Sequence, residues 1–311
     1  MNESLTIVIP VLDREATLPR VLRSVLAQTW RPLNVVLVDN GSQDSSLPLM
    51  QEWAERNASA ALHVRVAREH VPGASAARQR GLELTDTRRV MFFDSDDELL
   101  PLTAQAYMEA FRADPSLQIA LTSCSVAFPQ GGARLIRPRG GDPLATHFHH
   151  CTLRTQAWAA DTDLVRRAGG WDPAMRIWDD WELGLRLLLL SPSIRKLPLT
   201  GCVIHPTPGS VTGEAYHQRE PLYETPLLAA EKALLQAGTS HAARVAAMTD
   251  YRRVMLAALF AREGRQDLAH AWRLKALERT PSQRRRAMLN AAYAYIRRGG
   301  RGFDRLINLL Y

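Results

Sequence analysis

The chain has 311 residues, of which 46% are hydrophobic and 23% charged, which is enough material for a sizeable core and more than one domain. Three widely spaced cysteines do not make a disulfide framework. The first residues show neither a basic segment nor a hydrophobic run, and the longest apolar stretch, residues 187–190, is far shorter than the ~18 residues of a membrane span. We therefore expect a cytoplasmic protein without a signal peptide or a membrane-spanning segment.

The N-terminal segment predicts a strand, a helix and a second strand. Residues 5–11 are a β-branched run that is typical of a strand. Apolar residues then recur at helical spacing from residue 18 to 26, after Thr17 as a candidate cap. Residues 33–38 form a second apolar run that stops at Asp39, where turn-forming residues begin. Such a βαβ unit places its two strands parallel, with a right-handed crossover.

The most informative feature is a hydrophobic run that ends in carboxylates. Residues 90–93 have the apolar density of a parallel strand that is covered on both faces. Three carboxylates follow within four positions, at Asp94, Asp96 and Asp97. Open α/β sheets bind ligands at the carboxyl ends of their strands, where Asp39 also lies. Clustered carboxylates repel one another, so the group indicates Mg²⁺ or Mn²⁺; the first turn of a helix is the alternative reading.

Five blocks in order cover about residues 4–213. They are residues 9–15, residues 38–45, residues 71–82, residues 93–97, and residues 169–172 followed by residues 178–182. This ordered set resembles the motifs of the family 2 glycosyltransferases. The resemblance implies a GT-A fold, which is an α/β fold with a Rossmann-like, mostly parallel central sheet flanked by helices. It also implies inverting transfer of a sugar from a nucleotide-diphospho-sugar, with UDP as the expected nucleotide and Mn²⁺ or Mg²⁺ as the metal.

The resemblance assigns a set of residues to the donor. The nucleotide-sugar would be bound by Pro10, Val11, Asp13, Asp39, Arg78, Asp94 and Ser95. Asp96 would be the direct metal ligand, with Asp94 on the ribose or on metal-bound water. Arg78 would reach the pyrophosphate with its planar fork of donors; a surface arginine on a helix is the alternative. His205 would be a further metal ligand or a diphosphate donor, although a structural histidine is an equal alternative.

The resemblance assigns a second set to the acceptor. Asp180 occupies the position of the base that takes the proton from the acceptor hydroxyl. Trp171, Trp178 and Asp179 would line the acceptor side. Residues 178–190 read as a helix, so the macrodipole also favours carboxylates in this first turn. Asp179 replaces the glutamate of the family pattern, which keeps the carboxylate but shortens its reach.

The sequence changes character after about residue 220, where strand signals vanish and helical composition begins. We expect helices near residues 223–237, 240–263, 266–279 and 282–298. We therefore predict a catalytic domain over 1–219, with a nucleotide-sugar half over about 1–98 and an acceptor half over about 99–219. A helical region follows over 220–311. This region has a faint likeness to one tetratricopeptide repeat. Because such repeats come in arrays, we prefer the interpretation that it is a plain helical appendage.

The C-terminal tail is strongly basic. From residue 281 onward seven arginines accompany one aspartate, so the tail holds nearly all of the chain's net charge of +7. Interleaved apolar residues make the tail amphipathic, which indicates peripheral docking on anionic lipid, where a lipid-linked acceptor would reside. The alternative is a solvated helix whose apolar side packs on the protein. No motif indicates nucleic acid. The alternative function is a non-catalytic nucleotide-binding or scaffold protein derived from this fold, with a helical protein-interaction tail.

Overall fold

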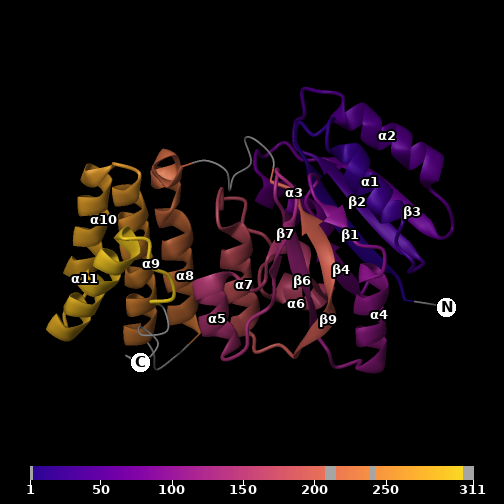
Figure 1. The fold of residues 1–311 in the computed structure, drawn as a ribbon. Coiled ribbons are helices and arrows are strands. Elements are labelled where there is room, and N and C mark those ends of the chain that lie inside the picture. The colour runs from indigo at the N-terminus through magenta and orange to yellow at the C-terminus, as the bar shows by residue number, and fades with distance from the viewer. Residues whose placement is uncertain (1–2, 207–214, 238–241, 304–311) are drawn as a thin grey trace. The chain divides into compact units, whose positions relative to one another are not determined.

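The computed structural model describes residues 3–206, 215–237 and 242–303 (Figure 1). The chain divides into two compact units, residues 1–210 and residues 211–311. The first unit is mixed α/β. In the second unit the described residues form helices and no strand. No helix in the described ranges is both long enough and apolar enough to span a bilayer.

One mixed sheet organises the first unit. Its described strands are β1 (Leu5–Val11), β2 (Leu33–Asp39), β3 (Leu62–Arg68), β4 (Arg89–Phe92), β5 (Glu98–Leu99), β6 (Ile119–Ala127), β7 (Ala133–Ile136), β8 (Trp158–Asp161) and β9 (Ile194–Ile204). Their order is β3-β2-β1-β4-β8-β6-β9-β5, and β7 pairs with β6. The strands β3, β2, β1 and β4 run parallel, which confirms the predicted βαβ unit. β8 is antiparallel to both β4 and β6.

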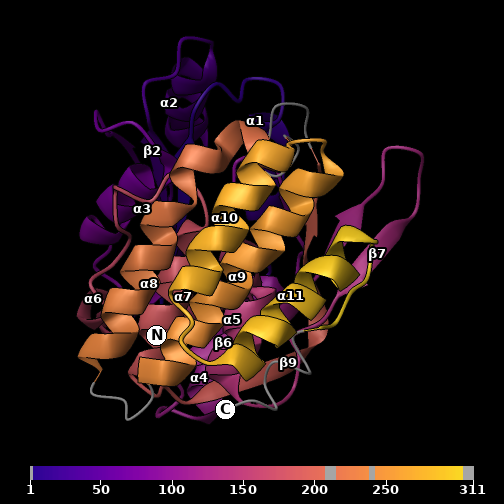
Figure 2. The same cartoon turned by 90° about the vertical axis from the view of Figure 1, so that its left-hand side faces the viewer.

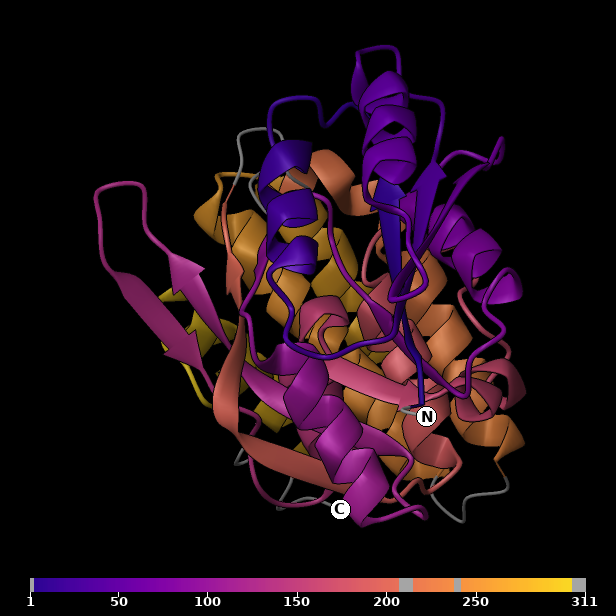
Figure 3. The ribbon, with the colours of Figure 1, turned by 90° about the vertical axis from the view of Figure 1, so that its right-hand side faces the viewer.

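Helices cover both faces of this sheet (Figure 3). One face carries α1 (Leu18–Leu26), α2 (Ser46–Asn57) and α4 (Thr103–Ala113), and the other carries α3 (Ala74–Glu83), α6 (Thr162–Arg167) and α7 (Asp179–Leu189). In β1, Ile7 and Ile9 join the core on the α1 side, whereas Val8 joins the core on the α3 side. Burial on both faces explains why β1, β2 and β4 are almost continuously hydrophobic.

Two short elements complete the first unit. The helix α5 (Pro143–His150) contacts α7, and the indole of Trp181 donates a hydrogen bond to the carbonyl of Phe148 at 2.9 Å. The buried ring of His147 lies 2.9 Å from the carbonyl of Trp181. The 3₁₀ turn η1 (Thr155–Ala157) leads directly into β8. These elements place the start of α7 and the start of β8 close to the carboxyl edge of the sheet.

The second unit contains the 3₁₀ turn η2 (Tyr216–Leu222) and four described helices (Figure 2). They are α8 (Glu224–Gln236), α9 (Ala242–Arg262), α10 (Gln266–Glu278) and α11 (Gln283–Arg297), each within two residues of its predicted bounds. The apolar stripe of α11, at Leu289, Ala292 and Ile296, packs on Tyr251 and Val254 of α9. The last apolar residues of the basic tail, from residue 304, lie outside the described ranges.

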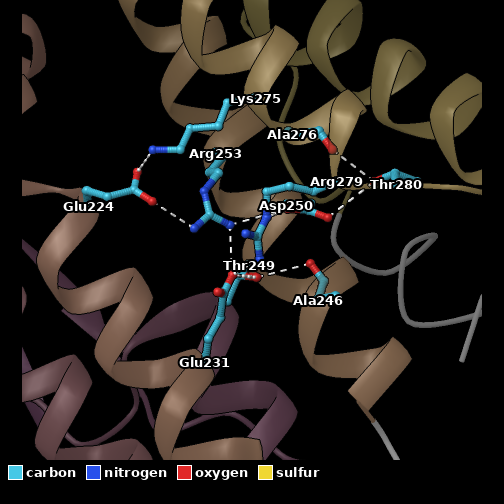
Figure 4. A network of polar contacts seen from close by, with 10 residues as sticks. All are labelled: Glu224, Glu231, Ala246, Thr249, Asp250, Arg253, Lys275, Ala276, Arg279 and Thr280. Carbon is cyan, nitrogen blue, oxygen red and sulfur yellow. Dashed lines mark hydrogen bonds and ion pairs between the residues drawn. The ribbon is translucent and has the colours of Figure 1, made fainter.

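A buried ionic network joins α8, α9 and α10 (Figure 4). The guanidinium of Arg253 has no exposed side-chain surface and lies 3.0 Å from Glu224 and 2.9 Å from Glu231. Arg279 contacts Glu231 at 2.6 Å and Asp250 at 3.1 Å. Because each carboxylate here has a cationic partner, the network fixes how these three helices pack without leaving a buried charge alone.

Candidate active site

The loops after β1 and β2 lock onto each other at the carboxyl edge of the sheet. The carboxylate of Asp13 accepts a hydrogen bond from the backbone of Gln43 at 2.7 Å. Glu15 accepts one from the backbone of Ser45 at 3.0 Å, and Asp44 accepts one from the backbone of Glu15 at 2.9 Å. Asp13 was predicted as a nucleotide contact. One of its carboxylate oxygens holds the loop after β2 against the loop after β1, beside Pro10 and Val11.

Asp39 is the last residue of β2 and Asn40 follows it, and their side chains make different hydrogen bonds. The buried carboxylate of Asp39 faces the backbone amides of Gly41 at 3.4 Å and Ser42 at 3.2 Å. The side chain of Asn40 donates to the carbonyl of Val71 at 2.8 Å and accepts from the amide of Gly73 at 2.6 Å. An aspartate at position 40 could accept but not donate when ionised, so these contacts account for asparagine at this position.

Three carboxylates converge after β4. Asp94, Asp96 and Asp97 each offer an oxygen, and these atoms lie within 4.8 Å of one another. Burial, followed by the nearby Asp94, raises the pKa of Asp97 to about 8. Burial is also the main reason why the pKa of Asp94 is raised, although Arg78 opposes it. A compact set of hard oxygen donors with incompletely compensated charge fits a divalent cation such as Mg²⁺ or Mn²⁺.

Gln156 binds two of these carboxylates, and it was not predicted as a site residue from the sequence. Its side-chain amide donates to Asp94 and, at 2.8 Å, to Asp97. It lies in η1, 62 residues after Asp94, and outside the five blocks of the family pattern. No local spacing could have predicted it, because the turn reaches the edge only when β8 pairs with β4.

The structure brings His205 and Ser95 to the same edge. The backbone amide of His205 donates to Asp97 at 2.9 Å, and its ring nitrogen Nε2 lies 3.4 Å from Glu98. Ser95 is buried, and its carbonyl accepts a hydrogen bond from the hydroxyl of Thr17 at 3.1 Å. Thr17 thus ties α1 to the acidic edge instead of capping its own helix with its side chain.

Arg78 is almost wholly buried between two carboxylates. Its Nη2 lies 2.6 Å from Asp94, and its Nη1 donates to Asp179. The guanidinium stacks over Trp171, with its carbon 4.7 Å from the ring centroid. Trp171, predicted on the acceptor side, is itself buried against Phe92, with the ring centroids 5.0 Å apart. The alternative of a surface arginine on a helix is therefore wrong, because Arg78 is buried at the packed edge of the sheet.

Asp180 stands in the first turn of α7, directly after Asp179. The residue before the helix, Trp178, has a left-handed backbone (φ 54°), and its ring centroid lies 5.6 Å from that of Trp181. Burial, and then the charge of Asp179, raise the pKa of Asp180 to about 6. A hydrogen bond from Cys151 opposes this rise. A carboxylate with such a pKa is ionised near neutrality and basic enough to take a proton.

Comparisons with known proteins agree with this geometry. Residues 6–139 match the sequence family described as glycosyl transferase family 2. The uncharacterized glycosyltransferase YibD of Escherichia coli (strain K12) is 30% identical over 131 residues, which are 42% of this chain and 37% of that protein. The chain thus spans little more than a third of the length of this curated relative.

Two solved structures share the fold. S. aureus TarS 1–349 in complex with UDP-GlcNAc aligns with a TM-score of 0.70 at 18% identity, over 94% of this chain and 88% of that one. The mannosyltransferase PcManGT from Pyrobaculum calidifontis, in complex with GDP-Man and Mn²⁺, aligns with a TM-score of 0.57 at 17% identity, over 94% and 80%.

The fold and the acidic edge define a class of protein, the GT-A α/β proteins with a mostly parallel sheet and helices on both faces, here followed by further helices. Within that class, residues 6–139 are similar to glycosyl transferase family 2, as the motifs of the chain predict. The predicted resemblance to this family and the predicted fold class are confirmed.

Proposed function

We propose that the chain is an inverting glycosyltransferase that moves a sugar from a UDP-linked donor to an acceptor hydroxyl, in polysaccharide, glycolipid or other glycoconjugate synthesis. The observation that carries the proposal is the convergence of Asp94, Asp96 and Asp97 at a GT-A sheet edge, with Asp180 on the adjoining helix. Asp96 would hold a divalent ion together with its carboxylate neighbours. That ion would supply positive charge to the departing diphosphate.

The residues of the chain would do the remaining work. Asp39 and the backbone of Pro10 and Val11 would orient the nucleotide base at the ends of β1 and β2. Asp180 would accept the proton of the acceptor hydroxyl as that oxygen attacks the anomeric carbon. Attack on the face opposite the diphosphate inverts the configuration, and the transition state resembles an oxocarbenium ion.

The neighbours support a nucleotide-sugar and a metal. The TarS structure is a complex with UDP-GlcNAc, which favours a UDP-linked donor here. The PcManGT structure is a complex with GDP-Man and Mn²⁺, which favours a divalent ion and makes GDP the alternative nucleotide.

The test is release of free nucleotide from UDP-GlcNAc, UDP-glucose and GDP-mannose with Mn²⁺, with water or added glycans as acceptor. Wild type should release nucleotide from one donor, and Asp180→Asn should lose at least ~100-fold of that rate. The exposed Asp163→Asn, on α6, is the matched control. Failure to turn over any donor would favour the non-catalytic scaffold.

We also propose that the basic part of α11 touches anionic lipid near a membrane-bound acceptor. Residues 283–303 contain six arginines and no acidic residue. Within the described part of the chain, the exposed Arg284, Arg297, Arg298 and Arg301 make no ion pair. Since the apolar stripe of α11 packs on α9, the contact would be electrostatic, at about 1 kcal/mol for each arginine near the surface.

Sedimentation with vesicles of phosphatidylglycerol tests this contact. Binding should fall with added salt and on changing these four arginines to glutamine. Equal sedimentation of the variant and wild type would refute the contact.

A further inference from the structure

Asp179 is held from three sides at the start of α7. One carboxylate oxygen accepts from Arg78 and lies 3.0 Å from the hydroxyl of Ser75. The other accepts the backbone amide of Asp180 at 3.0 Å. The hydroxyl of Ser75 also lies 2.7 Å from the carbonyl of Met175, in the loop before the helix. The first turn of α3 therefore fixes the first turn of α7.

The same arginine reaches the donor side. Arg78 Nη2 contacts Asp94, whose other oxygen accepts from Gln156. One planar guanidinium thus joins Asp94, in the cluster of three carboxylates, to Asp179, which directly precedes the candidate base. The ring of Trp171 supports it from one face. A lysine ammonium is a single point of charge and cannot hold both carboxylates in one plane.

We propose that Arg78 and Asp179 are positioning residues, which hold Asp180 at a fixed distance from the donor-side carboxylate Asp94. This inference rests on the proposed function, in which Asp180 is the base. Under this proposal Asp179 positions Asp180 and does not itself contact the acceptor. It also explains how a shorter aspartate serves at position 179: the Arg78 guanidinium is already at hydrogen-bond distance.

The pyrophosphate role expected for Arg78 makes a different prediction. Substituting a residue that binds the donor should weaken nucleotide affinity, whereas substituting a residue that positions the base should lower kcat. Small misplacements of a reacting group can cost about 100-fold in rate. The two roles are therefore separated by comparing UDP affinity with kcat.

The experiment measures UDP affinity by calorimetry with Mn²⁺, and kcat by nucleotide release, for Arg78→Lys and Asp179→Asn. The matched control is Arg80→Lys, a half-exposed arginine on the same helix whose guanidinium pairs with Glu83. We expect kcat to fall about 100-fold in both variants, with the dissociation constant of UDP within about threefold of wild type. The double variant should lose no more than either single one, because both break the same link.

Hydrogen exchange of residues 179–185 supplies a readout that does not need activity. Both variants should exchange faster there than wild type and Arg80→Lys. Unchanged exchange, or an unchanged kcat, would overturn the positioning role. A tenfold loss of UDP affinity with kcat retained would overturn it in favour of a pyrophosphate contact. If wild type turns over no donor but the exchange result holds, the proposed function fails and the link between α3 and α7 remains.

Discussion

At the scale of single residues, the site is built from side chains whose neighbours decide what each can do. Asp180 and Asp179 are adjacent in sequence, yet one is a candidate base and the other is bound on both oxygens. Burial, then the charge of Asp179, raise the pKa of Asp180 to about 6. This separation of roles follows from contacts made across the sheet edge.

The pH dependence of transfer should report Asp180. The base works only when ionised, and its raised pKa means that protonation begins as the pH falls towards about 6. We expect kcat to be level above that pH and to fall about tenfold for each unit below it. A pH profile from 4.5 to 8 checks this. A rate that is flat down to pH 5 would contradict the assignment.

Gln156 should matter for stability more than its neutral side chain suggests. Gln156→Leu removes the amide that bridges Asp94 and Asp97, leaving two carboxylates to face each other. We expect a loss of about 1–3 kcal/mol in the free energy of unfolding. Mn²⁺ should restore part of it, because the ion supplies positive charge beside the two carboxylates.

Thermal unfolding with and without Mn²⁺ measures the effect. The control is Gln51→Leu on the exposed side of α2. A melting temperature equal to wild type in both conditions would show that Gln156 does not hold these carboxylates together.

The sequence predicts the acidic residues but not their partners. The carboxylates at Asp39, Asp94 and Asp96 follow hydrophobic strands, so their edge could be predicted. Gln156 and Cys151 reach the site through tertiary pairing alone, and they carry no local signal. Arg78 was recognised as part of a motif, yet its two carboxylate partners lie 16 and 101 residues away.

At the scale of elements, the strands and helices follow the hydrophobic pattern closely. The first strand has its predicted bounds, and α7 begins one residue later than expected because Trp178 adopts a left-handed backbone. Strand order beyond β4 was not predicted, since antiparallel β8 enters the sheet from a distant segment. Periodicity specifies an element, whereas its neighbour depends on long-range packing.

The packing of α3 on β1 requires glycine at position 81. A Cβ built there would lie 2.1 Å from Cγ1 of Val8, which is closer than side chains approach. Gly81→Ala should therefore destabilise the first unit by about 1–3 kcal/mol, even though alanine favours a helix.

Chemical denaturation compares this variant with Gly140→Ala, where an added Cβ meets no described atom within 4 Å. The control should be neutral. If Gly81→Ala were as stable as wild type, α3 would have to shift easily on β1.

At the scale of the whole molecule, the chain is two compact units with different kinds of interior. The first is held mainly by two apolar layers on either side of a sheet. The second combines an apolar cluster with the ionic network around Arg253. Composition predicted the helices, but the network joins carboxylates 29, 22 and 3 residues from Arg253, and no sequence pattern marks it.

Arg253→Met should destabilise the second unit by about 3–5 kcal/mol, because it leaves buried carboxylates without one of their cations. Hydrogen exchange of α8, α9 and α10 in the full chain would show faster opening. The exposed Arg262→Met, on the same helix, should leave exchange unchanged. Unchanged exchange in Arg253→Met would mean that Arg279 and Lys275 suffice.

The measurement that tests the central claim most directly is calorimetric titration of UDP, GDP and dTDP, each with and without Mn²⁺. It uses wild type, Asp96→Ala and the exposed control Asp163→Ala. The account predicts that UDP binds wild type and the control only with Mn²⁺, and that Asp96→Ala binds at least ~10-fold more weakly. A UDP affinity that is the same without Mn²⁺ and in Asp96→Ala would contradict the claim that this acidic edge is a metal-dependent donor site. Absence of binding by all three nucleotides would contradict it as well.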